Sequence, residues 1–508
     1  MSSTVLGIVL VVAASLITAV VFYPDALIGA KARPDLPGPT GIPVLGNLVQ
    51  IFPHRKRMLY YLSVLEQRYG ELFTFVTPGT GRNIVINRPE WVEHIKKRCR
   101  VWKGDTVLAM FREFPGPGSA LASEGAQWKL ARKIMRPLFS SNSVDLHAFH
   151  AMSKIIPIAK NMLLSASRGD LKIDFNDFCG KLTLVILCEI ALNMETNILT
   201  SDPSCLTSTH ELVDDVSTLN HISAGRIYNP FWRITEIFDG TRKVFNDSRS
   251  RIHDLLDKLI QDKQKELSMA PPSVRDGDFL STLLRDSNIE DPTLLRDTLL
   301  NVMFAGHDTT QNVLVWSLYE LSRNPKWIHS MRGEALAQKN SVDEIPAYDE
   351  LSEYPIHLAV FYETLRLWPG VPKNARIALR DDVLPAVPGY HGGMPVAVSK
   401  GDYVTWSDYS IMRNEKIWGS DAQMFNPARH LDSSGKLVKP TPPKFHAFGA
   451  GPRLCPGAQL ATYEFVAIWA SFLPVFDFSP VEDKDRHPAD SLTMSMDGPF
   501  MITISARD

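Results

Sequence analysis

The N-terminal segment combines an uncharged apolar run with a proline-rich stretch. Residues 5–22 carry no charged side chain, and a run of this length crosses most of a bilayer core of about 30 Å. Basic residues follow the run and none precedes it, which places the N-terminus in the lumen and the remainder in the cytosol. We therefore expect a retained membrane anchor at residues 1–24, with a cleaved signal peptide as the alternative. Residues 25–59 are basic and include four prolines in ten positions, so we expect a stiff hinge there.

Downstream of the hinge, the spacing of apolar and polar positions is mostly helical. Residues 182–192 are apolar on nearly all sides, which predicts a buried helix. Residues 291–321 form a long periodic stretch that begins at an Asp-Pro start signal. Short strands are predicted at 72–76 and 83–86, around a glycine-containing turn. Because no second linker or repeat interrupts the pattern, we expect residues 60–508 to form one large domain, mostly α with a minor β region.

The composition is that of an ordinary globular protein and narrows the function classes. Of 508 residues, 44% are hydrophobic and 22% are charged, which excludes a disordered or collagen-like chain. Lys and Arg number 54 against 56 Asp and Glu, and this net charge of -2 does not support a nucleic-acid partner. The five cysteines are odd in number and include no CxxC pair, so neither a disulfide framework nor a zinc site is expected.

One cysteine is distinguished by the loop around it. Residues 448–457 place three glycines around Cys455, which describes a tight and rigid turn. A helix is predicted directly afterwards, at 458–472. The dipole of that helix and the neighbouring Arg453 both favour a thiolate at Cys455. A thiolate held in this way serves either as a metal ligand, which needs an open side, or as a nucleophile, which needs a nearby base.

The loop at 448–457, F-G-x-G-x-R-x-C-x-G, resembles the haem-binding loop of the cytochrome P450 family at every fixed position. The resemblance implies a cytochrome P450 fold with one N-terminal transmembrane helix and with haem b as cofactor. It makes Cys455 the axial thiolate ligand of the haem iron, which favours cleavage of the O–O bond. The loop residues that it assigns to haem binding are Phe448, Gly451, Arg453, Cys455 and Gly457.

A second motif lies inside the long predicted helix, where residues 305–310 read A-G-H-D-T-T. On this segment alone, a polar interruption of a core helix is an alternative reading. The motif is similar to the oxygen-binding helix of the same family. By that resemblance, Ala305 and Gly306 leave room for oxygen beside the iron, Thr309 donates a hydrogen bond to the oxygen, and Asp308 relays protons from water.

Two further patterns resemble the family's structural and propionate-binding residues. Glu363 and Arg366 lie on one face of a helix and, with Arg429, resemble a triad that braces the haem loop without taking part in the chemistry. The W-x-x-x-R spacing of Trp128 and Arg132 supplies donors suited to a haem propionate. The resemblance adds Arg453 and, by a looser match, Arg376 to the propionate ligands.

The substrate is less well defined by the sequence. Residues 291–301, 392–401 and 418–422 resemble the fungal microsomal hydroxylases of alkanes and fatty acids. The chain departs from that group at Trp368 and Gly370, where Tyr and Pro are usual. Such a changed pocket loop is compatible with oxidation of a terpenoid, polyketide or other secondary metabolite instead.

Candidate substrate-pocket residues are apolar. Val371, Met494 and Met496 would offer adaptable contacts to a hydrophobic substrate, with ordinary core packing as the alternative.

The resemblance as a whole implies a monooxygenase of the endoplasmic reticulum membrane. It would pass one oxygen atom of O2 to a hydrophobic small molecule, with its catalytic domain in the cytosol. Electrons would come from NADPH through NADPH–cytochrome P450 reductase, with cytochrome b5 as a further candidate donor.

Other enzyme and binding classes are less well supported. A rearranging or dehydrating haem enzyme needs no external electrons and conflicts with the intact Asp308 and Thr309 pair. A non-catalytic haem-binding protein and a metal-free cysteine hydrolase are remote alternatives.

Overall fold

The computed structural model describes the chain apart from a few short segments. These are residues 1–2, 23–32, 44, 79–80, 98–100, 103–104, 228, 230, 270–278, 286–288, 290, 340, 490 and 508. The chain divides into two compact units. The first comprises Met1–Val107, Gly225–Trp232 and Lys373–Ile411, and the second comprises Leu108–Ala224, Arg233–Pro372 and Met412–Asp508.

The first unit holds most of the β-structure. Its helices are α1 (Ser3–Phe22), α2 (Leu48–Ile51), α3 (Met58–Tyr69), α4 (Pro89–Lys97) and α17 (Asp408–Ile411). Its strands are β1 (Leu72–Thr77), β2 (Gly81–Ile86), β3 (Val101–Trp102), β5 (Lys373–Ala378), β6 (Asp382–Leu384), β7 (Val396–Val398) and β8 (Tyr403–Ser407). The helices α5 (Asp105–Glu113), α10 (Glu211–Ile227) and α11 (Trp232–Phe238) extend across the boundaries between the units along the chain.

A five-stranded sheet with the order β1-β2-β8-β5-β3 organises the first unit. The two predicted strands are confirmed as β1 and β2, which pair antiparallel with Leu72 opposite Ile86. β2 then pairs parallel with β8, although the two are far apart in the sequence. Phe73 and Val85 are buried against Leu65 of α3, which covers this end of the sheet.

The second unit is mainly helical. Its helices are α6 (Gly125–Met135), α7 (Ser141–Ser143), α8 (Phe149–Arg168), α9 (Phe175–Leu192), α12 (Thr241–Met269), α13 (Phe279–Arg285), α14 (Pro292–Arg323), α15 (Pro325–Gln338), α16 (Pro355–Leu367), α18 (Glu415–Trp418) and α19 (Ala458–Phe472). Its strands β4 (Ile173–Asp174), β9 (Phe476–Pro480) and β10 (Met501–Ala506) form a small sheet in the order β4-β10-β9. The predicted fold class, mostly α with a minor β region, is confirmed.

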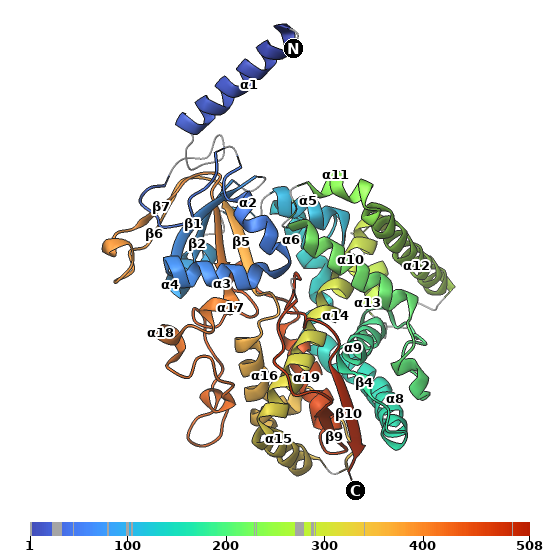
Figure 1. Cartoon of the computed structure of the whole chain (residues 1–508). Helices are drawn as coiled ribbons and strands as arrows, with labels where there is room; N and C mark the ends of the chain where they lie inside the picture. The colour runs from blue at the N-terminus through green and yellow to red at the C-terminus, as the bar shows by residue number, and fades with distance from the viewer. Residues whose placement is uncertain are drawn as a thin grey trace. The chain divides into compact units, whose positions relative to one another are not determined.

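Helix α14 is the central element of the second unit and confirms the predicted long helix. Its N-terminus is capped by Asp291, whose carboxylate accepts from the backbone N–H of Thr293 at 2.9 Å. The helix packs against α9, α16 and α19, as Figure 1 also shows. It approaches α9 closely at Gly306, where a Cβ atom would come within 3.1 Å of Leu187 Cδ2. Helix α9 is buried on nearly all sides, which confirms the buried helix predicted at residues 182–192.

The N-terminal region belongs to the first unit and includes helix α1. Helix α1 covers the predicted apolar run, and its described side chains are mostly exposed. Among the residues with a described placement, no helix is long and apolar enough to cross a membrane. In the expected hinge, Pro37 O accepts from Thr74 N at 2.8 Å, and Asn47 N donates to Val76 O at 2.7 Å. The later part of this stretch is therefore packed along β1.

Lys181 ties an irregular segment of the second unit to α9. Its side chain is 2% exposed, and its ammonium donates to the carbonyl oxygens of Cys205 at 2.9 Å and Ser208 at 2.7 Å. It also pairs with the Asp177 carboxylate at 2.6 Å. All three N–H groups of this buried cation therefore have an acceptor, which is the condition under which a buried charge is tolerated.

We predict that replacing Lys181 with Met lowers the free energy of unfolding by about 3–5 kcal/mol, because two carbonyls and a carboxylate lose their shared donor. Lys172→Met, at an exposed lysine near the same segment, is the matched control and should change stability by less than about 0.5 kcal/mol. The measurement is urea unfolding followed by circular dichroism. Equal losses in the two variants would contradict the proposed role of Lys181.

Candidate functional site

The loop before α19 has the tight geometry that its glycines predict. Gly449 and Gly451 have φ angles of 75° and 65°, in the left-handed region that glycine adopts without strain. The Cys455 N–H donates to Phe448 O at 2.9 Å, which closes the loop on itself. The Phe448 ring packs 6.1 Å from the ring of Phe361 on α16, so the loop is attached to the core of the second unit.

Cys455 is the accessible thiol among the four cysteines that the structure describes. Cys179, Cys188 and Cys205 are buried, whereas Cys455 is exposed; Cys99 lies outside the described residues. The pKa of the Cys455 thiol is raised, because the dense protein surroundings keep water from solvating a thiolate, while the backbone N–H of Gly457 and the Arg132 guanidinium act in the opposite direction. An accessible sulfur with a donor and a cation beside it is suited to act as a thiolate ligand.

Helix α6 brings the predicted propionate donors to the cysteine loop. Arg132 donates to Leu454 O at 3.0 Å, and the Arg453 guanidinium lies 4.2 Å from the ring centroid of Trp128. Arg453 also pairs with the Glu124 carboxylate, directly before α6. The cation that acts on the thiol is therefore Arg132, whereas Arg453, which the sequence suggested for this role, is engaged by Glu124.

Arg376 lies in the first unit, and its predicted contact with a propionate is not described. On β5, its guanidinium donates to Ala375 O at 2.7 Å and lies 5.6 Å from the ring centroid of Trp406. Its role in haem binding stays a prediction.

The A-G-H-D-T-T motif lies within α14, and its consecutive residues have different surroundings. Ala305 is exposed, whereas the missing side chain of Gly306 faces Leu187 of α9 and so serves helix packing. Thr309 Oγ1 donates to Ala305 O at 2.8 Å, the back-bond expected of a threonine within a helix. The Asp308 carboxylate accepts from the hydroxyl of Thr493 instead. The roles of these residues toward oxygen stay predictions.

The predicted triad of Glu363, Arg366 and Arg429 forms a connected buried network. Arg366 makes two hydrogen bonds of 2.8 Å to the Glu363 carboxylate, and Arg429 Nε adds a third at 3.0 Å. His430 Nε2 contacts the same carboxylate at 3.1 Å. Burial alone would raise the pKa of Glu363, but the hydrogen bonds from Arg366 and His430 outweigh it and lower the pKa to about 2. The carboxylate is therefore charged throughout the physiological pH range.

The candidate pocket residues differ in exposure. Val371 is 42% exposed, as expected for a residue at an open pocket, whereas Met494 and Met496 are 0% and 3% exposed, as expected for packed core. Of the two departures in the pocket loop, Trp368 stacks on Trp316 at a centroid distance of 3.6 Å and belongs to the core. Gly370 lies beside Thr309, whose Cβ would be 3.8 Å from a Cβ at position 370.

The residues around Cys455 fit a haem in their chemistry. The accessible thiol would supply a thiolate ligand, and Trp128, Arg132 and Arg453 carry N–H donors that suit carboxylates. Among the described residues, no cluster of His, Cys, Asp and Glu side chains could hold a bare metal ion instead.

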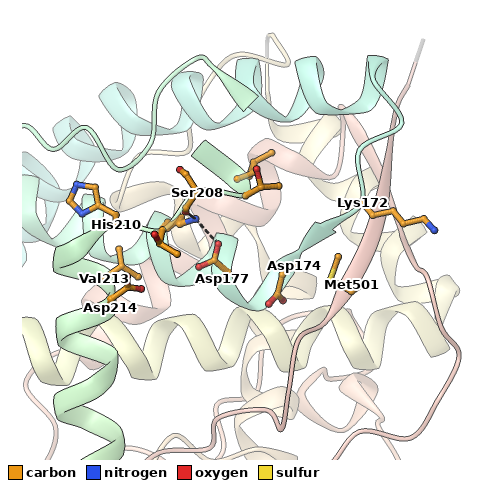
Figure 2. Close-up of a pocket in the computed structure, with 12 residues that line it drawn as sticks. Lys172, Asp174, Asp177, Ser208, His210, Val213, Asp214 and Met501 are labelled. Atoms are coloured by element: carbon orange, nitrogen blue, oxygen red, sulfur yellow. Dashed lines mark hydrogen bonds and ion pairs between the residues drawn. The ribbon is translucent and has the colours of Figure 1, made fainter. Parts of the chain in front are cut away.

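A separate surface cleft of about 380 Å³ lies on other elements of the second unit. Figure 2 shows Asp174, Asp177 and Asp214 at this cleft, with His210 nearby. None of the residues lining it is a predicted haem-site residue, and its buried lysine is already bonded to the protein. We do not assign the chemistry of the chain to this cleft.

Four residues that bear on the site were not found from the sequence. His430 could have been suspected from its position beside Arg429. Glu124 and Thr493 gave no signal, because their contacts come from distant parts of the chain. Glu464 of α19 is 5% exposed, and burial raises the pKa of this carboxyl to about 8 although Thr310 of α14 donates a hydrogen bond to it.

Comparison with known proteins gives extensive matches. A family profile described as Cytochrome P450 matches residues 36–504. Cytochrome P450 monooxygenase cyp1 of Mycosarcoma maydis is 31% identical over 96% of this chain and 78% of the relative. Cytochrome P450 94A1 of Vicia sativa is 28% identical over 92% of this chain and 91% of the relative. Cytochrome P450 52A3-A of Candida maltosa is 27% identical, over 92% and 89% respectively.

We predict a pH-dependent effect of Glu464→Gln on stability. The folded pKa of about 8 lies above the ordinary glutamate value of 4.5, so the folded chain binds this proton more tightly than the unfolded chain. Wild-type stability should therefore fall as the pH rises between these values, and the variant should lack this part of the fall. Relative to wild type, Glu464→Gln should gain about 2–3 kcal/mol between about pH 5.5 and about pH 7.5.

Urea unfolding at the two pH values measures this difference. The control is Glu353→Gln, at an exposed glutamate, which should keep the wild-type pH dependence. A pH-independent difference between Glu464→Gln and wild type would show that Glu464 does not titrate in this range.

Proposed function

Because the chain belongs to the cytochrome P450 family, we propose that it is a haem-thiolate monooxygenase that hydroxylates a hydrophobic small molecule. The observation that carries the proposal is the accessible thiol of Cys455 on the glycine-bounded loop before α19. The reaction balances as RH + O2 + NADPH + H⁺ → ROH + NADP⁺ + H2O. When bound, haem b supplies the iron centre at which O2 is reduced and activated.

The residues of this chain would bind and orient the cofactor and deliver protons. Cys455 would supply the thiolate ligand, while Trp128, Arg132, Arg453 and Arg376 would hold the propionates. Phe448, Gly451 and Gly457 would shape the loop around the sulfur. Asp308 and Thr309 would hold and transfer protons, shielded from bulk water.

Electrons would reach the site from a separate protein. We propose NADPH–cytochrome P450 reductase as the donor, with cytochrome b5 as a second candidate. The proposal rests on the family and on the sequence, which lacks a strand-linked G-x-G-x-x-G unit of the kind that binds NADPH.

We also propose that residues 1–24 anchor the enzyme in the endoplasmic reticulum membrane, with the catalytic domain in the cytosol. The support is the uncharged run at 5–22 and the basic residues that follow it. Residues 25–59 would link this anchor to the catalytic domain at 60–508.

For the substrate, we propose a long-chain alkane or fatty acid, on the resemblance to the fungal hydroxylase group. A second candidate is a wider molecule, a terpenoid, polyketide or other secondary metabolite. Gly370 favours this second candidate, because the missing side chain beside Thr309 leaves more width than the usual proline. Val371 would contact either substrate.

We predict that Cys455→Ser abolishes the thiolate-specific absorption of the reduced carbon monoxide complex, because an alcohol is a much weaker ligand than a thiolate. The measurement is the carbon monoxide difference spectrum of the reduced membrane protein. Cys205→Ser, at a buried cysteine, is the control and should keep the wild-type band. An unchanged band in Cys455→Ser would overturn the ligand assignment.

The substrate class is tested by titrating the oxidised enzyme with a long-chain fatty acid, a long-chain alkane, a sesquiterpene and a larger cyclic terpenoid. A bound substrate displaces water from the iron and shifts it toward high spin, which the absorption spectrum reports. We expect a saturable shift with the linear compounds. A shift with the cyclic compounds alone would contradict this expectation and favour the secondary-metabolite role.

A further inference from the structure

The polar face of α14 is joined to the segment at residues 491–496, which precedes β10. Trp316 Nε1 donates to Met494 O at 2.6 Å, and Met494 N donates to Gly370 O at 3.1 Å. One turn earlier on α14, Asn312 Nδ2 donates to Thr493 Oγ1 at 3.2 Å and lies 3.4 Å from Ser495 Oγ. These bonds fix the segment against the part of α14 that carries Asp308.

The Asp308 carboxylate is held by this segment. It accepts from the Thr493 hydroxyl, while the hydroxyl of the adjacent Thr309 donates to Ala305 O. Burial raises the pKa of Asp308, and the donors Thr493 and Asn312 partly oppose that rise. The neighbouring His307 is neutral, because burial lowers its pKa to about 4. The protonation of Asp308 thus depends mainly on burial and on neutral donors.

We propose that Thr493 is the positioning residue for Asp308 and that, with Ser495 and Asn312, it forms the path by which Asp308 exchanges protons with solvent. The inference rests on the proposed monooxygenase function, to which it adds a proton route. Its basis is the connected arrangement of three polar side chains that ends at the Asp308 carboxylate.

The geometry gives this path a direction. The single hydroxyl hydrogen of Thr493 is directed at Asp308, and the Thr493 oxygen accepts from the Asn312 amide, so the contact between Thr493 and Ser495 needs the hydrogen of Ser495. Thr493 then donates to Asp308, and Ser495, at 3.2 Å from Thr493 Oγ1, donates to Thr493. When Asp308 takes a proton from Thr493, Thr493 takes one from Ser495, and a hydronium ion of the solvent returns a proton to Ser495 and becomes water. Each hydroxyl gains one O–H bond and loses one, so the relay balances.

Two further observations fit a path that begins at solvent. Ser495 is partly exposed, whereas Thr493 is 6% exposed, so Ser495 can link the Thr493 hydroxyl to solvent. Asn312 Oδ1 is buried and has no hydrogen-bond partner among the described residues. A buried polar acceptor of this kind is a suitable place for an ordered water.

The main test compares Thr493→Val, which keeps the side-chain shape without the hydroxyl, with Thr493→Ser, which restores the hydroxyl. Thr298→Val is the matched control. Thr298 is buried like Thr493, but it lies on α14 and its hydroxyl donates to Leu294 O. In the oxidised holoenzyme, infrared spectroscopy follows the protonated carboxyl band of Asp308, identified by its loss in Asp308→Asn. We expect Thr493→Val to keep this band to higher pH, because the carboxylate loses a donor.

A second readout needs neither substrate nor reductase. The holoenzyme is reduced chemically and mixed with air-saturated buffer in water and in deuterium oxide, and its return to the oxidised spectrum is timed. We expect Thr493→Val to slow this step at least about tenfold and to change its solvent isotope effect. Thr493→Ser and Thr298→Val should both behave as wild type.

The inference is overturned if Thr493→Val leaves the infrared titration and the reoxidation rate unchanged, or if Thr493→Ser is impaired as severely as Thr493→Val. If Thr493→Val does not fold, Ser495→Ala interrupts the same path at its accessible end. That variant should slow reoxidation with little change in the infrared titration, and a wild-type rate would count against the path. A wild-type enzyme without the thiolate absorption would instead refute the proposed function, and the infrared titration would still decide the role of Thr493.

Discussion

The buried carboxylate of Glu363 is the constraint on which the part of the second unit around the Cys455 loop depends. A fully enclosed charge is tolerated only when its partners are complete, and here two arginines and a histidine supply them. Arg366 extends the network, because its remaining N–H groups donate to the carbonyl oxygens of Met412, Ala422 and Met424. One ion pair on α16 therefore fixes a long stretch with little regular structure, and that stretch leads into the loop of Cys455.

The elements that the sequence predicts correctly are those whose signals are local. Helix α14 begins at an Asp-Pro cap and continues through a periodic apolar pattern, so both its start and its burial can be predicted from the sequence. The strands β1 and β2 are adjacent in the chain and joined by a turn. The division into two units could not be predicted from the sequence. It depends on pairings such as that of β2 with β8. These two strands are distant in sequence, and neither contains a local signal that identifies the other as its partner.

The candidate site follows the same rule. The loop around Cys455 is encoded by glycines at positive φ and by the helix that follows, all within a few residues. The partners that set its electrostatics are distant: Glu124 pairs with Arg453, which leaves Arg132 as the cation that acts on the thiol. Adjacency in sequence suggested Arg453 for that role. It was a poor guide, because the direction of a long side chain is decided by its ion-pair partner and not by its distance along the chain.

The polar stretch of α14 illustrates how packing and chemistry constrain the same residues. Successive positions on a helix point about 100° apart, so neighbouring residues meet different elements. Gly306 meets α9, Asp308 meets the 491–496 segment, and Thr310 meets Glu464 of α19. Asp308 and Thr310 are therefore each matched to one particular polar neighbour, which is the condition for placing such groups inside a protein. A substitution at one of these positions must also preserve its contact, so the polar residues of this stretch and the packing of three surrounding elements cannot vary independently.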